Sequence, residues 1–100
     1  MVKHIVMWKL NDSANGKTKL ENALEIKHRL EMLNGIIPGM IKLEVGIDVS
    51  GTENSADIVL YSEFESLEAL NNYQVNPEHE KIKPFVLSCR SERRIVDYEI

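Results

Sequence analysis

Cysteine is nearly absent from this chain of 100 residues, in which Cys89 stands alone. One cysteine cannot form a disulfide within the chain, so a disulfide-stabilised extracellular scaffold is excluded. Proline occurs three times and glycine five times, and no stretch rich in glycine, serine or proline divides the chain. We therefore expect a single domain over residues 1–100, working in a reducing cytoplasm.

Positive charge is scarce too, since 12 Lys and Arg stand against 16 Asp and Glu, giving a net charge of −4. The densest basic group, Arg90, Arg93 and Arg94, is small. Nucleic-acid-binding proteins carry an extended basic surface, so we expect no nucleic-acid partner. The chain has no apolar run of the about 20 residues that cross a membrane and no signal-peptide pattern, so we expect no membrane association.

Motifs for metals, phosphates and covalent nucleophiles are also missing. The three histidines, His4, His28 and His79, lack the spacing of a zinc site, and the chain has no glycine-rich phosphate loop or nucleophile elbow. We expect neither a cofactor nor a metal. We interpret Cys89 as a small buried apolar residue and His28 as a solvated or interface side chain.

Apolar periodicity and turn residues predict the order β-α-β-β-α-β. The expected elements are strands at 3–10, 40–49, 57–64 and 93–100, a helix at 17–33, and a second helix in two parts from 67 and from 77 onward. Ser13 or Asn15 is the expected cap of the first helix. Asn76 and Pro77 are expected to start the second part of the broken helix, and Pro84 to kink it.

Two elements have a clear apolar face. The helix at 17–33 is expected to bury Leu20, Ala23, Leu24, Ile26, Leu30 and Leu33. The strand at 40–49 is expected to place Ile41, Leu43, Val45, Ile47 and Val49 on one side. Both elements are therefore expected to be buried on one side and exposed on the other.

The element order is that of the ferredoxin-like α+β fold, in which a four-stranded antiparallel sheet carries its helices on one face. The strand at 3–10 is apolar on both sides, so its second side would stay bare in a monomer. We therefore expect a two-fold homodimer joined through the sheet faces, a dimeric α+β barrel. The alternative is a monomer in which the 11–16 loop or the chain end covers the sheet.

A series of short motifs resembles the stress-responsive dimeric α/β-barrel (Dabb) family. The motifs are Val2-Lys3-His4-Ile5-Val6, Ile37-Pro38-Gly39, Gly46 with Asp48, Phe64-Glu65-Ser66-Leu67-Glu68-Ala69-Leu70, Tyr73 with Pro77-Glu78-His79, and Asp97-Tyr98-Glu99. The resemblance covers essentially the whole chain and implies the fold and the dimer. One plant branch of this family consists of polyketide cyclases similar to olivetolic acid cyclase, and another forms stable ring-like oligomers associated with stress tolerance.

The resemblance to the cyclase branch implies a pocket between the helices and the sheet. Its Tyr and His match Tyr73 and His79, and two further pocket residues match His4 and Asp97. Many relatives have His where this chain has Asn76. The plant enzymes also carry aromatic residues on the first helix where this chain is aliphatic.

A neutral imidazole at His79 would be able to act as a general base near neutral pH. Tyr73 would then donate its phenolic hydrogen to a substrate carbonyl while His79 removes the adjacent proton, with Asp97 orienting the imidazole. The alternative is that these residues serve packing and capping, with Asp97 bound to the backbone or to Arg93 or Arg94.

The leading interpretation is a stress-response, small-ligand-binding homodimer without assigned catalysis, whose ligand is a small apolar or aromatic molecule. The first alternative is a polyketide-cyclase-like or isomerase-like enzyme that uses Tyr73 and His79 for proton abstraction beside a carbonyl. The second alternative is a structural oligomer that contributes to stress tolerance. Whether the chain is an enzyme stays open at this stage.

Overall fold

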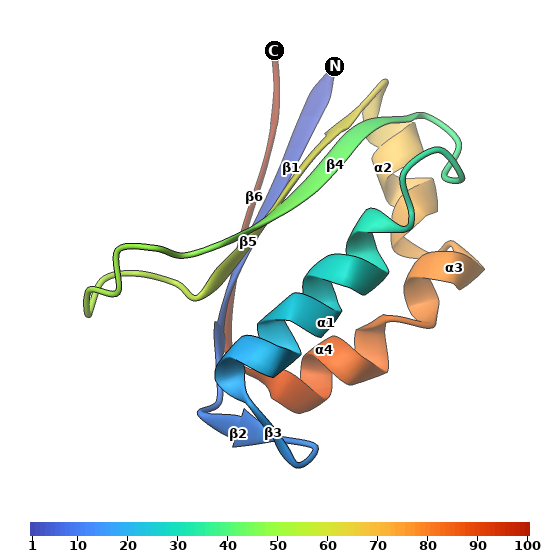
Figure 1. Cartoon of the computed structure of the whole chain (residues 1–100). Coiled ribbons are helices and arrows are strands. Elements are labelled where there is room, and N and C mark those ends of the chain that lie inside the picture. The colour runs from blue at the N-terminus through green and yellow to red at the C-terminus, as the bar shows by residue number, and fades with distance from the viewer.

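A four-stranded antiparallel sheet carries all the main helices on one face, as the computed structural model of residues 1–100 shows (Figure 1). The strands are β1 (Val2–Leu10), β4 (Met40–Ile47), β5 (Ile58–Phe64) and β6 (Arg90–Glu99), in the spatial order β4-β5-β1-β6. The helices are α1 (Lys19–Glu31), α2 (Leu67–Gln74), α3 (Pro77–Glu80) and α4 (Lys83–Cys89). The predicted ferredoxin-like architecture is confirmed, and no helix is long and apolar enough to cross a membrane.

Strand β1 lies inside the sheet between β5 and β6, and its side chains alternate between the two faces. The helix-facing side chains are all buried and belong to Val2, His4, Val6, Trp8 and Leu10. The side chains between them, including Ile5 and Met7, point to the face that has no helices. The sheet therefore has one covered face and one open face.

The segment before α1 is a small hairpin rather than the predicted loop. Strands β2 (Ser13–Ala14) and β3 (Lys17–Thr18) pair antiparallel across Asn15 and Gly16. Both turn residues have positive φ, 56° and 72°, which is the conformation that an Asn-Gly pair adopts in a two-residue hairpin turn.

Helix α1 starts two residues later than predicted because Thr18, not Ser13 or Asn15, caps it. The Thr18 side chain accepts a hydrogen bond from the Glu21 backbone N–H at 3.2 Å, and Glu21 Oε1 accepts one from the Thr18 N–H at 3.0 Å. This reciprocal capping box satisfies two backbone donors at the helix start. The predicted caps Ser13 and Asn15 were therefore wrong.

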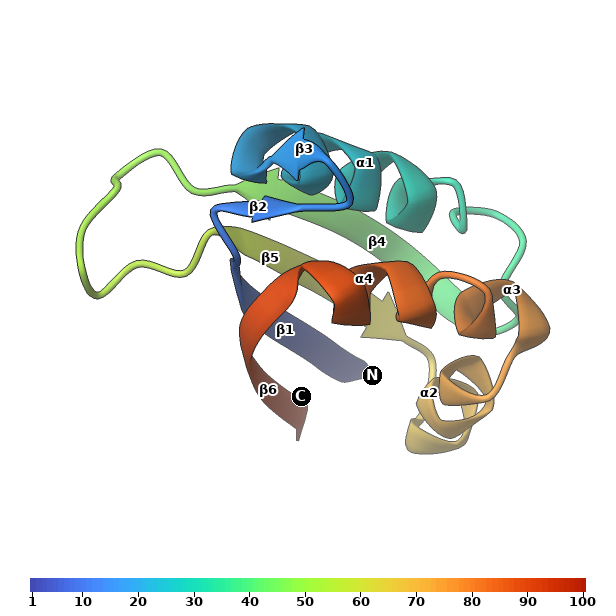
Figure 2. The same cartoon turned by 90° about the horizontal axis from the view of Figure 1, so that it is seen from below.

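The buried stripe of α1 is narrower than predicted. Ala23, Ile26 and Leu30 are buried, whereas Leu20 and Leu24 are 58% and 51% exposed. At about 100° per residue, these two leucines lie to one side of the stripe that meets the sheet. Helix α4 covers the sheet beside α1 (Figure 2). The prediction that Leu20 and Leu24 face the core was wrong.

The second helical region forms three helices rather than two. The Asn76 side chain accepts from the Glu78 N–H at 2.9 Å and Pro77 opens α3, as predicted. Pro84 takes the second position of α4, where a missing N–H costs no helical hydrogen bond. The chain therefore breaks before Pro84 instead of kinking at it, and β6 begins at Arg90 rather than at 93.

Strand β4 departs from simple alternation at both ends. Its pairing with β5 slips between Met40 and Lys42, which leaves Ile41 52% exposed. The strand ends at Ile47, so Val49 lies fully exposed in the following loop. That loop extends away from the sheet as an arm (Figure 2). The predicted shared face therefore holds for Leu43 and Val45 but not for Ile41 and Val49.

Candidate functional site

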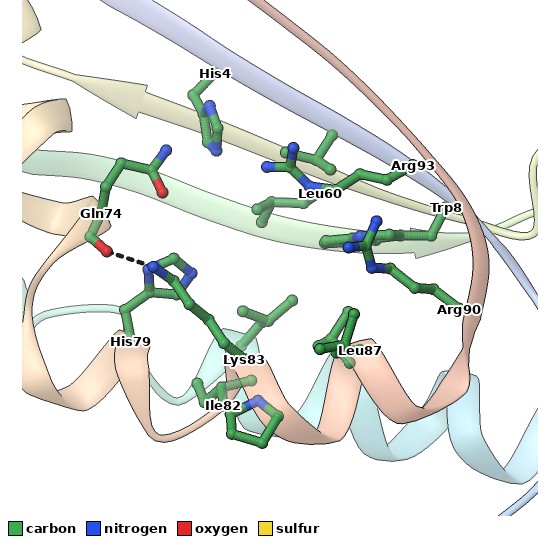
Figure 3. Close-up of a pocket in the computed structure, with 14 residues that line it drawn as sticks. His4, Trp8, Leu60, Gln74, His79, Ile82, Lys83, Leu87, Arg90 and Arg93 are labelled. Atoms are coloured by element: carbon green, nitrogen blue, oxygen red, sulfur yellow. Dashed lines mark hydrogen bonds between the residues drawn. The ribbon is translucent and has the colours of Figure 1, made fainter.

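A cavity of about 490 Å³ lies between the helix-facing side of the sheet and helices α3 and α4 (Figure 3). Most of its apolar lining comes from the sheet, α1 and α4, through Val6, Trp8, Leu30, Leu60, Ile82 and Leu87. Small-molecule sites typically enclose about 300–1,000 Å³ behind mostly apolar walls. The size and lining of this cavity are therefore those of a small-molecule site.

His4 reaches the cavity from the centre of β1. His4 is only 2% exposed. Its Nδ1 lies 2.5 Å from Oδ1 of Asp97, the residue directly opposite on the neighbouring strand β6. A carboxylate only accepts hydrogen bonds, so the imidazole donates from Nδ1. This contact holds the ring in place, with Nε2 as its remaining polar atom, in a residue that lines the cavity.

His79 lies on the other side of the same cavity, at the third residue of α3. Its Nδ1 lies 3.2 Å from the carbonyl oxygen of Tyr73, to which it can donate. Burial, reinforced by the nearby charge of Lys83, lowers the pKa of His79 to about 4. The imidazole is therefore neutral at pH 7, and with Nδ1 donating, its Nε2 is an acceptor.

Tyr73 forms the wall behind His79. The Tyr73 and His79 rings stack with centroids 4.1 Å apart and an interplanar angle of 17°. The centroid of the Phe64 ring lies 5.1 Å from that of the Tyr73 ring. The Tyr73 hydroxyl is buried without a hydrogen-bond partner, and burial raises its pKa. Tyr73 is not among the residues that line the cavity; it stacks against His79, which does line it.

The four residues selected from the sequence form one connected group. His4 and His79 line the cavity, and the Tyr73 ring, which stacks on His79, also lies 6.2 Å from the His4 ring in an edge-on arrangement. Asp97 pairs with His4 rather than with His79 or a neighbouring arginine. Two imidazoles therefore meet at one cavity. His4 is held by the Asp97 carboxylate, and His79 is held by the Tyr73 backbone carbonyl.

Four polar side chains at the cavity were not identified from the sequence. Gln74, Lys83, Arg90 and Arg93 all line it. Arg93 was assigned to the very start of a strand, where its side-chain direction is undetermined. The observed strand continues to Arg90, and the alternation of β6 places Arg93 on the same face as Asp97.

Metal binding finds no support in the side-chain arrangement. No three His, Cys, Asp or Glu side chains gather closely enough to hold an ion. Cys89 is buried, as predicted.

Comparison with known structures identifies close similarity in fold. A dimeric ferredoxin-like protein of unknown function from Bacteroides fragilis is 35% identical, with a TM-score of 0.87, 99% of this chain covered and 95% of that one. A dimeric ferredoxin-like protein of unknown function from Thermobifida fusca is 17% identical, with a TM-score of 0.84 and coverage of 99% and 90%. A protein from Arabidopsis thaliana is 26% identical, with a TM-score of 0.79 and coverage of 100% and 95%.

A search of curated protein sequences gave no match. The model of the stress responsive A/B barrel domain, Dabb, matches residues 2–100. The chain therefore belongs to the stress-responsive A/B barrel domain family, as its motifs predict.

Proposed function

We propose that this protein is a homodimeric α/β-barrel protein that binds a small, largely apolar ligand in the cavity between the sheet and helices α3 and α4. The observation that carries this proposal is the cavity itself, about 490 Å³ in volume and lined by seven apolar residues. Apolar walls supply the binding energy through burial of ligand surface. His79 adds a neutral acceptor, and His4 adds a second polar group, both of which would orient a ligand carrying a polar group.

A thermal-shift titration with 1-naphthol, an aromatic molecule with one hydroxyl donor, tests this proposal. A ligand that binds only the folded chain raises the melting temperature progressively as its concentration exceeds its Kd. Leu87→Trp should abolish the shift, because Leu87 lines the cavity but is 63% exposed, so the larger ring can occupy the opening without overpacking the core.

Leu24→Trp is the matched control, since Leu24 is 51% exposed on α1 and lies outside the cavity. This variant should respond to 1-naphthol like the wild type. An unchanged melting temperature in the wild type, or equal shifts in Leu87→Trp and Leu24→Trp, would contradict binding in the cavity.

The homodimer is proposed from the open face of the sheet. Its apolar side chains come from three neighbouring strands and are Ile5, Met7, Val59, Tyr61, Val96 and Tyr98. Lys3 and Lys42 border this surface, each with its ammonium 5.6 Å from the centre of the Tyr61 ring. An exposed apolar surface of this kind with a polar rim is typical of an interface, and pairing two copies covers it symmetrically.

Two neighbouring residues of β6 allow a matched test of this interface. Val96 and Ile95 are 48% and 45% exposed, but Val96 lies on the open face and Ile95 on the helix-facing side. We expect Val96→Glu to sediment at the 11.5 kDa of one chain, while the wild type and Ile95→Glu sediment at twice that mass. A wild-type protein of 11.5 kDa at micromolar concentration would contradict the dimer.

The second candidate function is proton abstraction beside a carbonyl, with His79 as the base and the Tyr73 ring stacked against it; the Tyr73 hydroxyl is buried and does not line the cavity, so it does not donate to the substrate carbonyl. The observation behind this candidate is that His79 lines the cavity with an unprotonated ring at pH 7, although its pKa of about 4 lies below the operating pH and makes the imidazole a weak base. The base would take the proton on Nε2, since Nδ1 faces the Tyr73 carbonyl. His4, which Asp97 holds in place from outside the cavity, would contact the opposite side of the substrate.

Deuterium exchange into 1-phenylbutane-1,3-dione, followed by NMR, tests the second candidate. The wild type should accelerate exchange over buffer, His79→Gln should remove most of the acceleration, and Tyr73→Phe, which keeps the stacked ring, should leave it unchanged. If His79→Gln exchanges as fast as the wild type, His79 is not the base. Ligand binding without any acceleration would leave the first proposal standing alone.

A further inference from the structure

We infer that the cavity ligand is an organic anion, an apolar carboxylate whose carboxyl group binds Arg90 and Arg93. This inference rests on the proposed ligand-binding function and narrows its ligand class. It follows from the charges at the cavity, from the lack of partners for two guanidinium groups, and from the position of these groups relative to the apolar lining.

The charge at the cavity has the opposite sign to that of the whole chain. The chain carries 16 acidic and 12 basic residues, yet none of the 14 residues lining the cavity is acidic. Three of them, Lys83, Arg90 and Arg93, are cationic. Walls of low polarity strengthen the field of such charges inside a cavity, which therefore favours an anion over a neutral or cationic molecule.

The two arginines have no carboxylate partner within the chain. Every ion pair involves other residues, and Lys83 is engaged with Glu80 Oε1 at 2.5 Å and with the Gln74 carbonyl at 2.6 Å. Arg90 and Arg93 are therefore the free cations at this cavity. A guanidinium presents parallel N–H donors that match the two oxygens of a carboxylate.

The positions of these groups define an orientation for the ligand. Arg93 lies opposite Trp8 across the β1–β6 pair, and Arg90 lies where α4 passes into β6. Figure 3 shows both arginine side chains on the β6 side of the cavity, near Trp8 and Leu60, with His79 on the other side. A carboxylate at the arginines would direct the apolar part of the ligand over Trp8 and Leu60 toward His79.

Three probes of equal chain length separate charge from apolar burial: octanoate, 1-octanol and octylammonium. Isothermal titration calorimetry on the wild-type protein at low ionic strength should give octanoate the tightest binding, at least tenfold tighter than 1-octanol, with octylammonium the weakest. Added salt should weaken octanoate more than 1-octanol, because screening acts only on the charged ligand.

Two variants locate the anion. Arg90→Gln and Arg93→Gln should each weaken octanoate about tenfold while leaving 1-octanol binding unchanged. Lys17→Gln removes the same charge from an exposed residue that does not line the cavity, and it should bind octanoate like the wild type. Equal losses in Lys17→Gln and Arg93→Gln would show that only net charge matters, and would overturn the assignment of the arginines.

The wild-type comparison decides the inference even if a variant fails to fold. If 1-octanol or octylammonium binds as tightly as octanoate, the anion preference is refuted while the ligand-binding function stands. If none of the three probes binds, the ligand-binding function fails and the anion inference fails with it. Tighter octanoate binding that survives both arginine variants would refute the role of Arg90 and Arg93.

Discussion

The neutral state of His79 has a measurable consequence for the pH dependence of folding. Its pKa falls from 6.5 in the unfolded chain to about 4 in the folded one, chiefly because the ring is buried. As the pH drops through 6.5, the unfolded chain therefore binds a proton that the folded chain does not. The free energy of unfolding decreases over this range, and the decrease is complete only below the folded pKa of about 4.

The size of the effect follows from the two pKa values. One pKa unit corresponds to about 1.4 kcal/mol, so His79 should lower the free energy of unfolding by about 2 kcal/mol between about pH 7 and about pH 5. Glu31 and Asp48, whose pKa values are lowered by hydrogen bonds, lose their contributions at lower pH. Above pH 5, the decrease in the free energy of unfolding is therefore due mainly to histidine protonation in the unfolded chain.

Urea unfolding at a series of pH values, at one fixed protein concentration, measures this loss. The wild type should lose about 2 kcal/mol between about pH 7 and about pH 5, and His79→Gln should lose clearly less. NMR titration of the His79 ring protons gives the pKa directly. Equal pH dependence in both proteins, or a folded-state pKa of 6 or above, would refute the neutral, desolvated imidazole.

Three further predictions concern stability and are measured by chemical denaturation. Gly39→Ala should lower the free energy of unfolding by about 3 kcal/mol, because φ is +77° and the added Cβ would lie 2.6 Å from the Ala69 Cβ. Gly35→Ala, where φ is +83° and the space is open, should lower it by about 1 kcal/mol. Equal losses in the two variants would contradict the close approach at Gly39. Thr18→Ala should cost about 1 kcal/mol through loss of the capping box, and no loss would contradict the assigned helix start. Asp97→Ala, which removes the acceptor of the His4 Nδ1 hydrogen bond, should cost about 1 kcal/mol and shift the His4 ring signals in nitrogen-15 spectra, and an unchanged spectrum would contradict the pairing.

Local sequence signals predicted much of the fold. The alternation in residues 3–10, and the Asn76-Pro77 start of α3, depend on neighbours along the chain and were confirmed. The Asn15-Gly16 pair is also a local hairpin signal, but the two strands it joins are only two residues each and carry no apolar alternation. A loop was predicted there for that reason.

The rest of the site depends on contacts that periodicity does not contain. The pairing of His4 with Asp97 requires the register of β1 against β6, which joins residues 93 positions apart. The exposure of Leu20 and Leu24 depends on which face of α1 meets the sheet, and the spacing of its apolar residues alone does not determine that. The cationic side of the cavity required the true start of β6 at Arg90, which the sequence did not reveal.

Fluorescence of Trp8 tests the central claim, a helix-side cavity that takes an apolar ligand, most directly. Trp8 is the only tryptophan, is 6% exposed and lines the cavity, so it reports on that space alone. Titration with 8-bromo-1-octanol, whose bromine quenches tryptophan on contact, should give saturable quenching that unbrominated 1-octanol competes away. Quenching that rises without saturation and is insensitive to 1-octanol would contradict a ligand site beside Trp8.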